Sequence, residues 1–163
     1  MFIDYQKVYD HVNQLKVIEY LNSRGCGNTF LKVLQHAMIS SGIIGDKLFK
    51  TGAMVKQGGN TICNSFTSYI DPTIDPIKTY GPDGWLEDIH ILLLMGDTVI
   101  LASSRESMEA KLAKLKTSVD DIGMLLHSCQ YLTLNTNDTT PFMLGDAVTF
   151  KTASYTYWGT YFK

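Results

Sequence analysis

The chain has 163 residues, of which 45% are hydrophobic and 18% are charged, and its formal net charge is -2. This length and apolar content predict one ordinary globular domain with its own core, and they exclude an intrinsically disordered chain. A domain that binds nucleic acid by charge alone is normally basic, so the slight acidic excess argues against that class.

The spacing of the cysteines and the length of the apolar runs bear on where the protein is located and on whether it spans a membrane. Cys26, Cys63 and Cys129 are far apart and lack Cys-x-x-Cys spacing, so neither a disulfide framework nor a zinc site is expected. A reducing intracellular compartment, the cytoplasm or the nucleus, is therefore the expected location. The longest apolar run, residues 89–102, is interrupted by polar residues and glycine, which argues against a membrane span.

Hydrophobic periodicity in the first half of the chain predicts a strand followed by helices. The strand is expected at Phe2-Ile3, and Asp4 follows it at once. Apolar residues spaced by three and four then predict a helix over residues 8–21. The elements expected after it are a helix over 28–40, a hairpin over 43–58 with its turn at 45–46, and a helix over 61–70.

The second half predicts a turn at 81–84, a hairpin, a long helix and short strands. Two apolar runs flank Gly96-Asp97, which is typical of a two-residue hairpin connection. Ser103 or Ser104 is expected to cap a helix with an apolar stripe from Met108 to Leu126 and with Lys111 facing water. Short strands are expected at 131–134, 142–144, 148–151 and 155–162. Residues 1–163 are thus expected to form a single α+β domain, with helices on one face of an antiparallel sheet.

Two acidic residues are candidate site residues because of their position. Asp4 ends a strand, and Asp97 is expected at the tip of a hairpin. Carboxylates at adjacent strand ends can bind divalent metals, and two metals can support phosphoryl transfer. Spacing alone favours a simpler role, because aspartate in a turn is more often a turn former.

Several strings along the chain are similar to the motifs of one enzyme family. Residues 2–10 read FIDYQKVYD, residues 55–58 read VKQG, and residues 91–102 read ILLLMGDTVILA. Residues 66–71, 134–137 and 157–161 follow the same order of motifs. Together they resemble the palm motifs of reverse transcriptases from non-LTR (LINE-like) retrotransposons, whose usual forms are F-I-D-Y-x-K-A-F-D, R-Q-G and I-L-L-Y-A-D-D-T-V-I-L-A.

The resemblance implies a palm subdomain without the fingers and thumb, and it assigns roles by position. In that family the aspartates of the first motif and of the hairpin hold two Mg²⁺ ions. Asp4 matches the first of these aspartates, and Tyr9 matches the aromatic residue beneath the incoming sugar. Gln57 and Gly58 match the loop near the nucleotide.

The sequence departs from the family at the residues that carry the chemistry. Gly96 stands where the first hairpin aspartate is expected and offers no side-chain oxygen, so Asp4 and Asp97 leave a two-metal site short of ligands. The segment after Gly58 lacks the P-L-S-P residues. Asp138 stands where a lysine is expected near the leaving phosphate, and a carboxylate there would repel pyrophosphate.

Simpler roles are favoured for most of these residues. Asp4 is interpreted as a strand-end residue, Asp97 as the second residue of a tight turn, and Tyr9 as a side chain packed on the sheet. Gln57 and Gly58 are interpreted as a flexible loop. The stripe from Met108 to Leu126 is either a core face or a docking surface. An aromatic cluster forms a hairpin or an interface, or stacks bases, and consists of Tyr155, Tyr157, Trp158, Tyr161 and Phe162.

The favoured hypothesis is a catalytically inactive reverse-transcriptase-derived palm that acts as a structural or protein-interaction module in a larger assembly. Other protein subunits are its expected partners, and no cofactor is expected. The alternatives are an RNA-directed DNA polymerase fragment, which would need Mg²⁺, and a nucleic-acid-binding module without chemistry.

Overall fold

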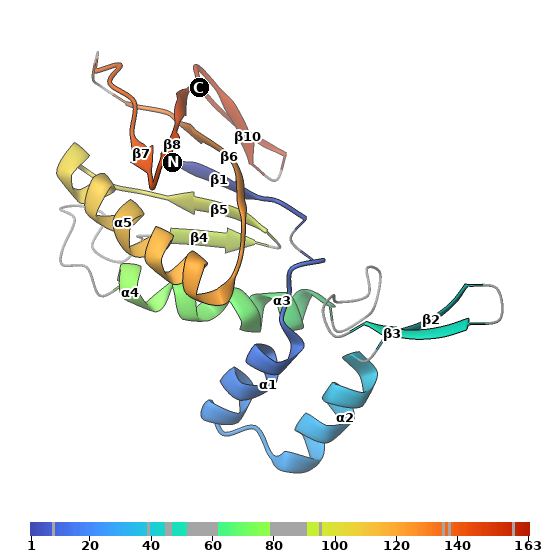
Figure 1. Ribbon diagram of the computed structural model, residues 1–163. Coiled ribbons are helices and arrows are strands. Elements are labelled where there is room, and N and C mark those ends of the chain that lie inside the picture. Colours follow the sequence, from blue (N-terminus) through green and yellow to red (C-terminus); the bar gives the residue numbers. More distant parts are fainter. Residues whose placement is uncertain are drawn as a thin grey trace.

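A computed structural model describes most of the chain (Figure 1). The described residues are 1–7, 9–38, 40–44, 47–51, 62–78, 91–94, 96–134, 136, 138–157 and 159–163. The expected turns at 45–46 and 81–84 lie outside them, as do Gln57, Gly58 and Trp158.

A five-stranded sheet forms the centre of the fold, in the order β4-β5-β1-β6-β9. Its strands are β1 (Phe2–Tyr5), β4 (Ile91–Leu94), β5 (Asp97–Ile100), β6 (Leu126–Tyr131) and β9 (Phe150–Lys151). Neighbouring strands are antiparallel except β6 and β9, which are parallel. The fold is therefore α+β as expected, but the sheet is mixed and not purely antiparallel. The hairpin of β7 (Met143–Leu144) and β8 (Ala147–Val148) separates β6 from β9, which lets the chain return in the same direction.

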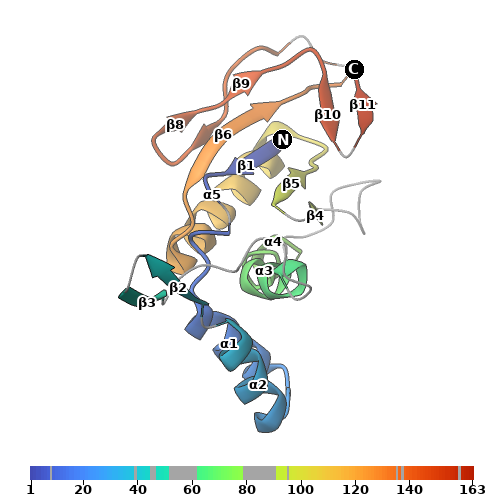
Figure 2. The same cartoon turned by 90° about the vertical axis from the view of Figure 1, so that its right-hand side faces the viewer.

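The two faces of the sheet have different surroundings. Alternation along β1 places Ile3 and Tyr5 on the inner face, where their side chains are buried, and places Phe2 and Asp4 on the outer face. Figure 2 shows the helical layer on one side of β1 and the hairpin of β10 and β11 on the other. The inner layer consists of α3 (Ile62–Ile70), the short helices η1 (Asp71–Thr73) and α4 (Asp75–Lys78), and α5 (Arg105–Ile122).

The long helix α5 has a capping residue at each end. The Ser104 side chain accepts a hydrogen bond from the Ser107 amide, and Gly123 ends the helix with a φ of 76°. Most of the expected apolar stripe is buried, from Met108 to Val119, and its end at Ile122 and Leu126 is partly buried against the same core, which favours the core interpretation over the docking surface. The helix pattern predicts that Lys111 faces water, but it is fully buried, and its Nζ donates to the Leu101 carbonyl at 2.7 Å. Lys111 lies three residues after Met108 and four residues before Leu115, so it shares the buried face of the helix with them.

Two helices extend from the sheet domain at its lower end in Figure 1. α1 (Gln14–Ser23) begins six residues later than expected because the Asn13 side chain caps it by accepting from the Leu15 and Lys16 amides. The Tyr20 hydroxyl donates to Asp71, which ties α1 to η1. α2 (Asn28–Met38) packs against α1 and is followed by the hairpin of β2 (Ser40–Ile44) and β3 (Lys47–Thr51).

The C-terminal strands differ from expectation mainly at β6. This strand begins at Leu126, a residue expected on the helix, because Gly123 ends α5. β10 (Tyr155–Tyr157) and β11 (Thr160–Phe162) form the last hairpin. Within the described residues, no helix is both long and apolar enough to cross a bilayer.

Candidate functional site

The hairpin that carries Asp97 differs from its expected form by one residue. β4 ends at Leu94, β5 begins at Asp97, and these two residues pair with each other. Asp97 is therefore the first residue of a strand and not the second residue of a turn, as the Gly96-Asp97 spacing predicted. Gly96 lies in the turn with a φ of 135°, a backbone conformation that residues with a Cβ rarely adopt.

Asp4 and Asp97 lie on neighbouring strands at one end of the sheet. Phe2 pairs with Val99 and Ile3 with Thr98, so Asp4 and Asp97 are the next residues along both strands, just beyond these pairs. Paired residues of antiparallel strands share a face, so both carboxylates belong to the outer face. Asp97 is exposed and Asp4 is half-buried. The structure thus brings together the two acidic residues that the sequence singled out.

The C-terminal hairpin lies on the same outer face. The rings of Phe2 and Tyr155 stack with centroids 3.8 Å apart and an angle of 16° between their planes, and the Phe162 ring lies 6.3 Å from that of Phe2. Phe2 and Asp4 are two residues apart on one face of β1, about 7 Å along the strand, so Tyr155 lies next to the acidic pair.

The charge of the acidic pair reaches the two tyrosines of β10. Burial raises the pKa of Tyr155, and the charges of Asp97 and Asp4 raise it further. Burial also raises the pKa of Tyr157, with a further contribution from Asp97. We call the surface formed by these four side chains the Asp–Tyr face; its residues are Asp4, Asp97, Tyr155 and Tyr157.

Only part of the expected aromatic cluster belongs to this face. Tyr155 pairs with Phe162, whereas Tyr161 pairs with Thr156 on the other side of the hairpin, where 64% of its surface is exposed. Tyr161 therefore points away from the sheet. Trp158 lies outside the described residues.

The donor set of the Asp–Tyr face is small for metal chemistry. Asp4 and Asp97 supply carboxylates, and Gly96, beside them, supplies none. Two-metal catalysis needs carboxylates that are shared between hard cations. Across the part of the chain that the structure describes, no three His, Cys, Asp or Glu residues come close enough to hold a metal ion together. The face therefore offers two negative charges and two phenol groups.

Tyr9 packs against the core beside α3. Its ring meets the Phe66 ring edge-on, with centroids 5.7 Å apart, and Phe66 belongs to α3. Tyr9 is partly buried against the core that lines the inner face of the sheet, so it serves as a packing residue, as expected, on the side of α3. Gln57 and Gly58 lie outside the described residues.

Asp138 is held at the opposite end of the sheet from the acidic pair. Asp97 begins β5, whereas Arg105, five residues after the end of that strand, donates from its Nε to the Asp138 carboxylate at 2.9 Å. The Thr140 amide donates to the same carboxylate at 2.8 Å, and Lys151 Nζ donates to the Asp138 carbonyl at 2.7 Å. In this structure Asp138 anchors a loop through these contacts, away from Asp4 and Asp97.

Arg105 is the residue of this loop that the sequence did not single out. Its guanidinium also pairs with Glu109 at 3.0 Å, donates to the Thr140 carbonyl and lies 4.2 Å from the centroid of the Phe142 ring. The only local signal is its place at the first position of α5, next to a capping serine. The partner loop is more than 30 residues away in sequence, which periodicity cannot reveal.

The Asp138 carboxyl should titrate well below an ordinary aspartate. Hydrogen bonding from the Thr140 amide, then from the Thr140 side chain and then from Arg105 lowers its pKa from 3.8 to about 2. Because the folded pKa is the lower one, the contribution of this carboxylate to stability is complete above the unfolded pKa and is lost as the pH falls through about 2. A ¹³C NMR titration should show this midpoint, and Arg105→Gln should raise it. The urea-unfolded chain is the control and should titrate near 3.8. An ordinary midpoint in the native chain would contradict the ion pair.

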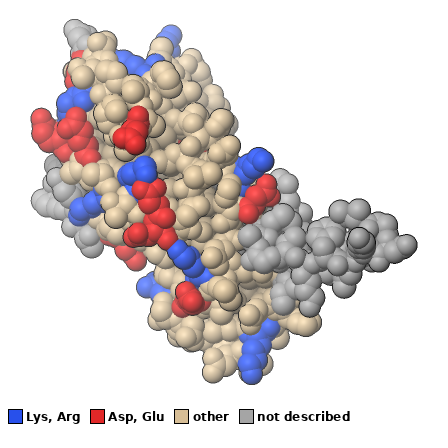
Figure 3. All heavy atoms as spheres, in the orientation of Figure 1, with Lys and Arg blue, Asp and Glu red and all other residues tan. Residues whose placement is uncertain are grey.

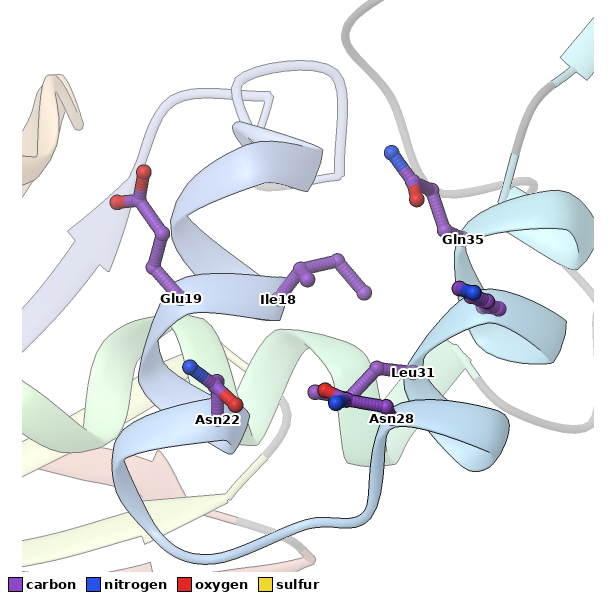
Figure 4. Close-up of a pocket in the computed structure, with 7 residues that line it drawn as sticks. Ile18, Glu19, Asn22, Asn28, Leu31 and Gln35 are labelled. Carbon is purple, nitrogen blue, oxygen red and sulfur yellow. The ribbon is translucent and has the colours of Figure 1, made fainter.

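A groove of about 280 Å³ lies between α1 and α2 (Figure 4). Ile18 and Leu31 point toward each other across it, and the amides of Asn22 and Asn28 lie at its lower end. Its remaining lining residues are Glu19, Lys32 and Gln35. Of the candidate site residues that the structure describes, none is among those that line this groove.

Comparison with known proteins adds no family to these observations. No protein-family model matches the chain, and no curated protein matches it significantly.

Proposed function

We propose that the chain is a reverse-transcriptase-like palm without polymerase activity, which serves as a structural or protein-interaction module in a larger assembly. The order of the sequence motifs supports the palm relationship. The placement of β1 beside the β4–β5 hairpin is compatible with it, because it brings Asp4 and Asp97 to one end of the sheet.

One observation carries the proposed loss of activity. Gly96, next to Asp97, occupies the place of a metal-binding aspartate in the motif and contributes no oxygen. Its φ of 135° is a conformation that an aspartate would adopt only at a cost, so the turn is shaped for glycine. Asp4 and Asp97 could still contact a divalent ion, but they would have to neutralise a triphosphate and an attacking hydroxyl without a third carboxylate.

The surface charge supports interaction with protein more than with nucleic acid. Figure 3 shows acidic and basic side chains interspersed on the face that carries α5. A nucleic-acid surface would gather basic residues into a patch or stripe. Cys26 and Cys129 are free thiols, which suits the reducing cytoplasm or nucleus that we propose as the location.

The second candidate is an RNA-directed DNA polymerase fragment that other subunits complete. The pairing of the strands that carry Asp4 and Asp97 favours it, because both carboxylates could bind Mg²⁺ on one face. No step of that reaction can be assigned to Gly96 or to Asp138, which is held by Arg105.

A primer-extension assay tests the proposal. The chain, incubated with a primer–template duplex, nucleoside triphosphates and Mg²⁺ or Mn²⁺, should extend the primer no more than its Asp97→Asn variant does. An active reverse transcriptase in the same buffer is the positive control. Template-dependent extension that is lost in the Asp4→Asn and Asp97→Asn variants would overturn the proposal in favour of the polymerase fragment.

A further inference from the structure

We infer that the Asp–Tyr face binds a basic side chain, arginine or lysine, from a segment of a partner protein. This inference rests on the proposed interaction function and names the chemistry of the partner. It combines the two acidic residues with the tyrosines of β10 in one binding surface, whereas the sequence motifs treat them separately.

The geometry places carboxylates and aromatic rings around one corner of the molecule. Asp4 and Asp97 are the next residues beyond the paired Ile3 and Thr98 on neighbouring strands, at the outer face of the sheet. The Phe2–Tyr155 stack fixes the hairpin against that face. Alternation along β10 turns Tyr155 and Tyr157 to the same side, and both are half-buried. Asp4 and Asp97 on the sheet therefore form the acidic floor of the Asp–Tyr face. Tyr155 and Tyr157 on the hairpin form its aromatic wall.

Among the described residues, no basic group lies within ion-pair distance of the acidic floor. Neither Asp4 nor Asp97 forms an ion pair there, while other surface carboxylates do, as Glu109 does with Arg105. Like charges that lie opposite each other on paired strands destabilise a sheet. A cation bound between them would remove this repulsion, so the face is complementary to positive charge.

The aromatic wall favours an organic cation over a hydrated metal ion. Arginine and lysine bind to the faces of tyrosine rings through cation–π attraction, and the arginine fork can donate to carboxylates at the same time. Mg²⁺ instead demands near-octahedral oxygen coordination, for which Gly96 supplies no ligand. A phosphate backbone would be repelled by the two carboxylates.

The margin of the face has the composition of a protein interface. Leu92 lies on the outer face of β4, and Phe162 lies beside Tyr155, and each keeps 43% of its surface exposed. Aromatic and apolar side chains around a buried polar contact are typical of protein–protein interfaces. A basic segment could therefore place its charged group between Asp4 and Asp97 and cover Leu92 and Phe162 with its flanking residues.

NMR titration with a defined peptide tests the inference. The probe is the N-acetylated, C-amidated peptide Gly-Arg-Leu-Arg-Gly, added at low salt to the ¹⁵N-labelled full chain. Amide signals of β1, β5 and β10 should shift, and those of α1 and α2 should not. Asp4→Asn and Asp97→Asn should each weaken binding by about tenfold, because each removes one charge-assisted contact. Asp121→Asn, an exposed aspartate on α5, is the matched control and should bind like the native chain.

The outcomes separate this inference from the proposed function. Absence of shifts at low salt, binding that survives in both aspartate variants, or equal binding of Gly-Glu-Leu-Glu-Gly would overturn the inference alone. Shifts of the same amides by Mg²⁺ that prevent peptide binding would overturn it in favour of a metal site. The primer-extension assay needs no peptide, so its result tests the proposed function independently. Melting curves of the Asn variants establish that each is folded before it is titrated.

Discussion

Replacing Gly96 by aspartate should lower the free energy of unfolding by about 1–3 kcal/mol and should restore neither metal binding nor polymerisation. The substitution supplies the carboxylate that the motif lacks. However, Gly96 has a φ of 135°, and an L side chain in that region of backbone space is strained. The new carboxylate also joins Asp4 and Asp97, and three like charges repel one another. Urea unfolding and a Mg²⁺ titration followed by NMR measure the two effects.

Gly27→Asp is the matched control for this substitution. Gly27 precedes α2, has no positive φ, and has open space around the position of a Cβ. Aspartate just before the first residue of a helix is a favourable cap, so stability should be unchanged or should rise by up to about 1 kcal/mol. A Gly96→Asp chain as stable as the native one, with Mg²⁺ bound beside Asp4, would show that the turn readily accepts a side chain and would weaken the case for lost activity.

Leu115→Ala should destabilise the fold by about 2–5 kcal/mol. Leu115 is fully buried in α5, where it packs with the other stripe residues against the inner face of the sheet. Truncation removes apolar contacts and leaves a cavity, and both effects lower the free energy of unfolding. Thermal or urea unfolding followed by circular dichroism measures the loss.

Leu134→Ala applies the same chemical change to an exposed position. Leu134 keeps 68% of its surface exposed, so its truncation should change the free energy of unfolding by no more than about 0.5 kcal/mol. Equal losses for the two variants would contradict the assignment of the α5 stripe to the core. They would also reopen the interpretation of that stripe as a surface for a partner.

Elements with strong local signals could be predicted from the sequence. The apolar stripe and the capping serine located α5, and the runs on either side of Gly96 located the hairpin of β4 and β5. The predicted bounds of elements differ from the structure where one turn or capping residue sets the end of a helix or strand. Because the turn lies at Gly96, Asp97 belongs to β5 and not to the turn. Because Asn13 caps α1, this helix begins later than expected. Because α5 ends at Gly123, Leu126 belongs to β6 and not to the helix.

The candidate site could be predicted only in part, because its contacts join distant segments. Motif order selected Asp4 and Asp97, and the strand register brought them together. No sequence signal indicates that the β10–β11 hairpin packs on Phe2, since the stacked rings of Phe2 and Tyr155 are more than 150 residues apart. The motif selected Asp138 but could not reveal its ion pair with Arg105, because the two residues are more than 30 positions apart in sequence.

The central position of β1 has a consequence for how the chain folds. This strand lies between β5 and β6 and pairs Phe2 with both Val99 and Gln130, although it is the first strand of the chain. Its backbone groups therefore find partners only after long loops have closed, and such non-local pairing slows folding. During synthesis β1 emerges long before β5 and β6, so it has neither neighbour until β5 is made and keeps one open edge until β6 is made, and such an apolar strand needs protection from aggregation.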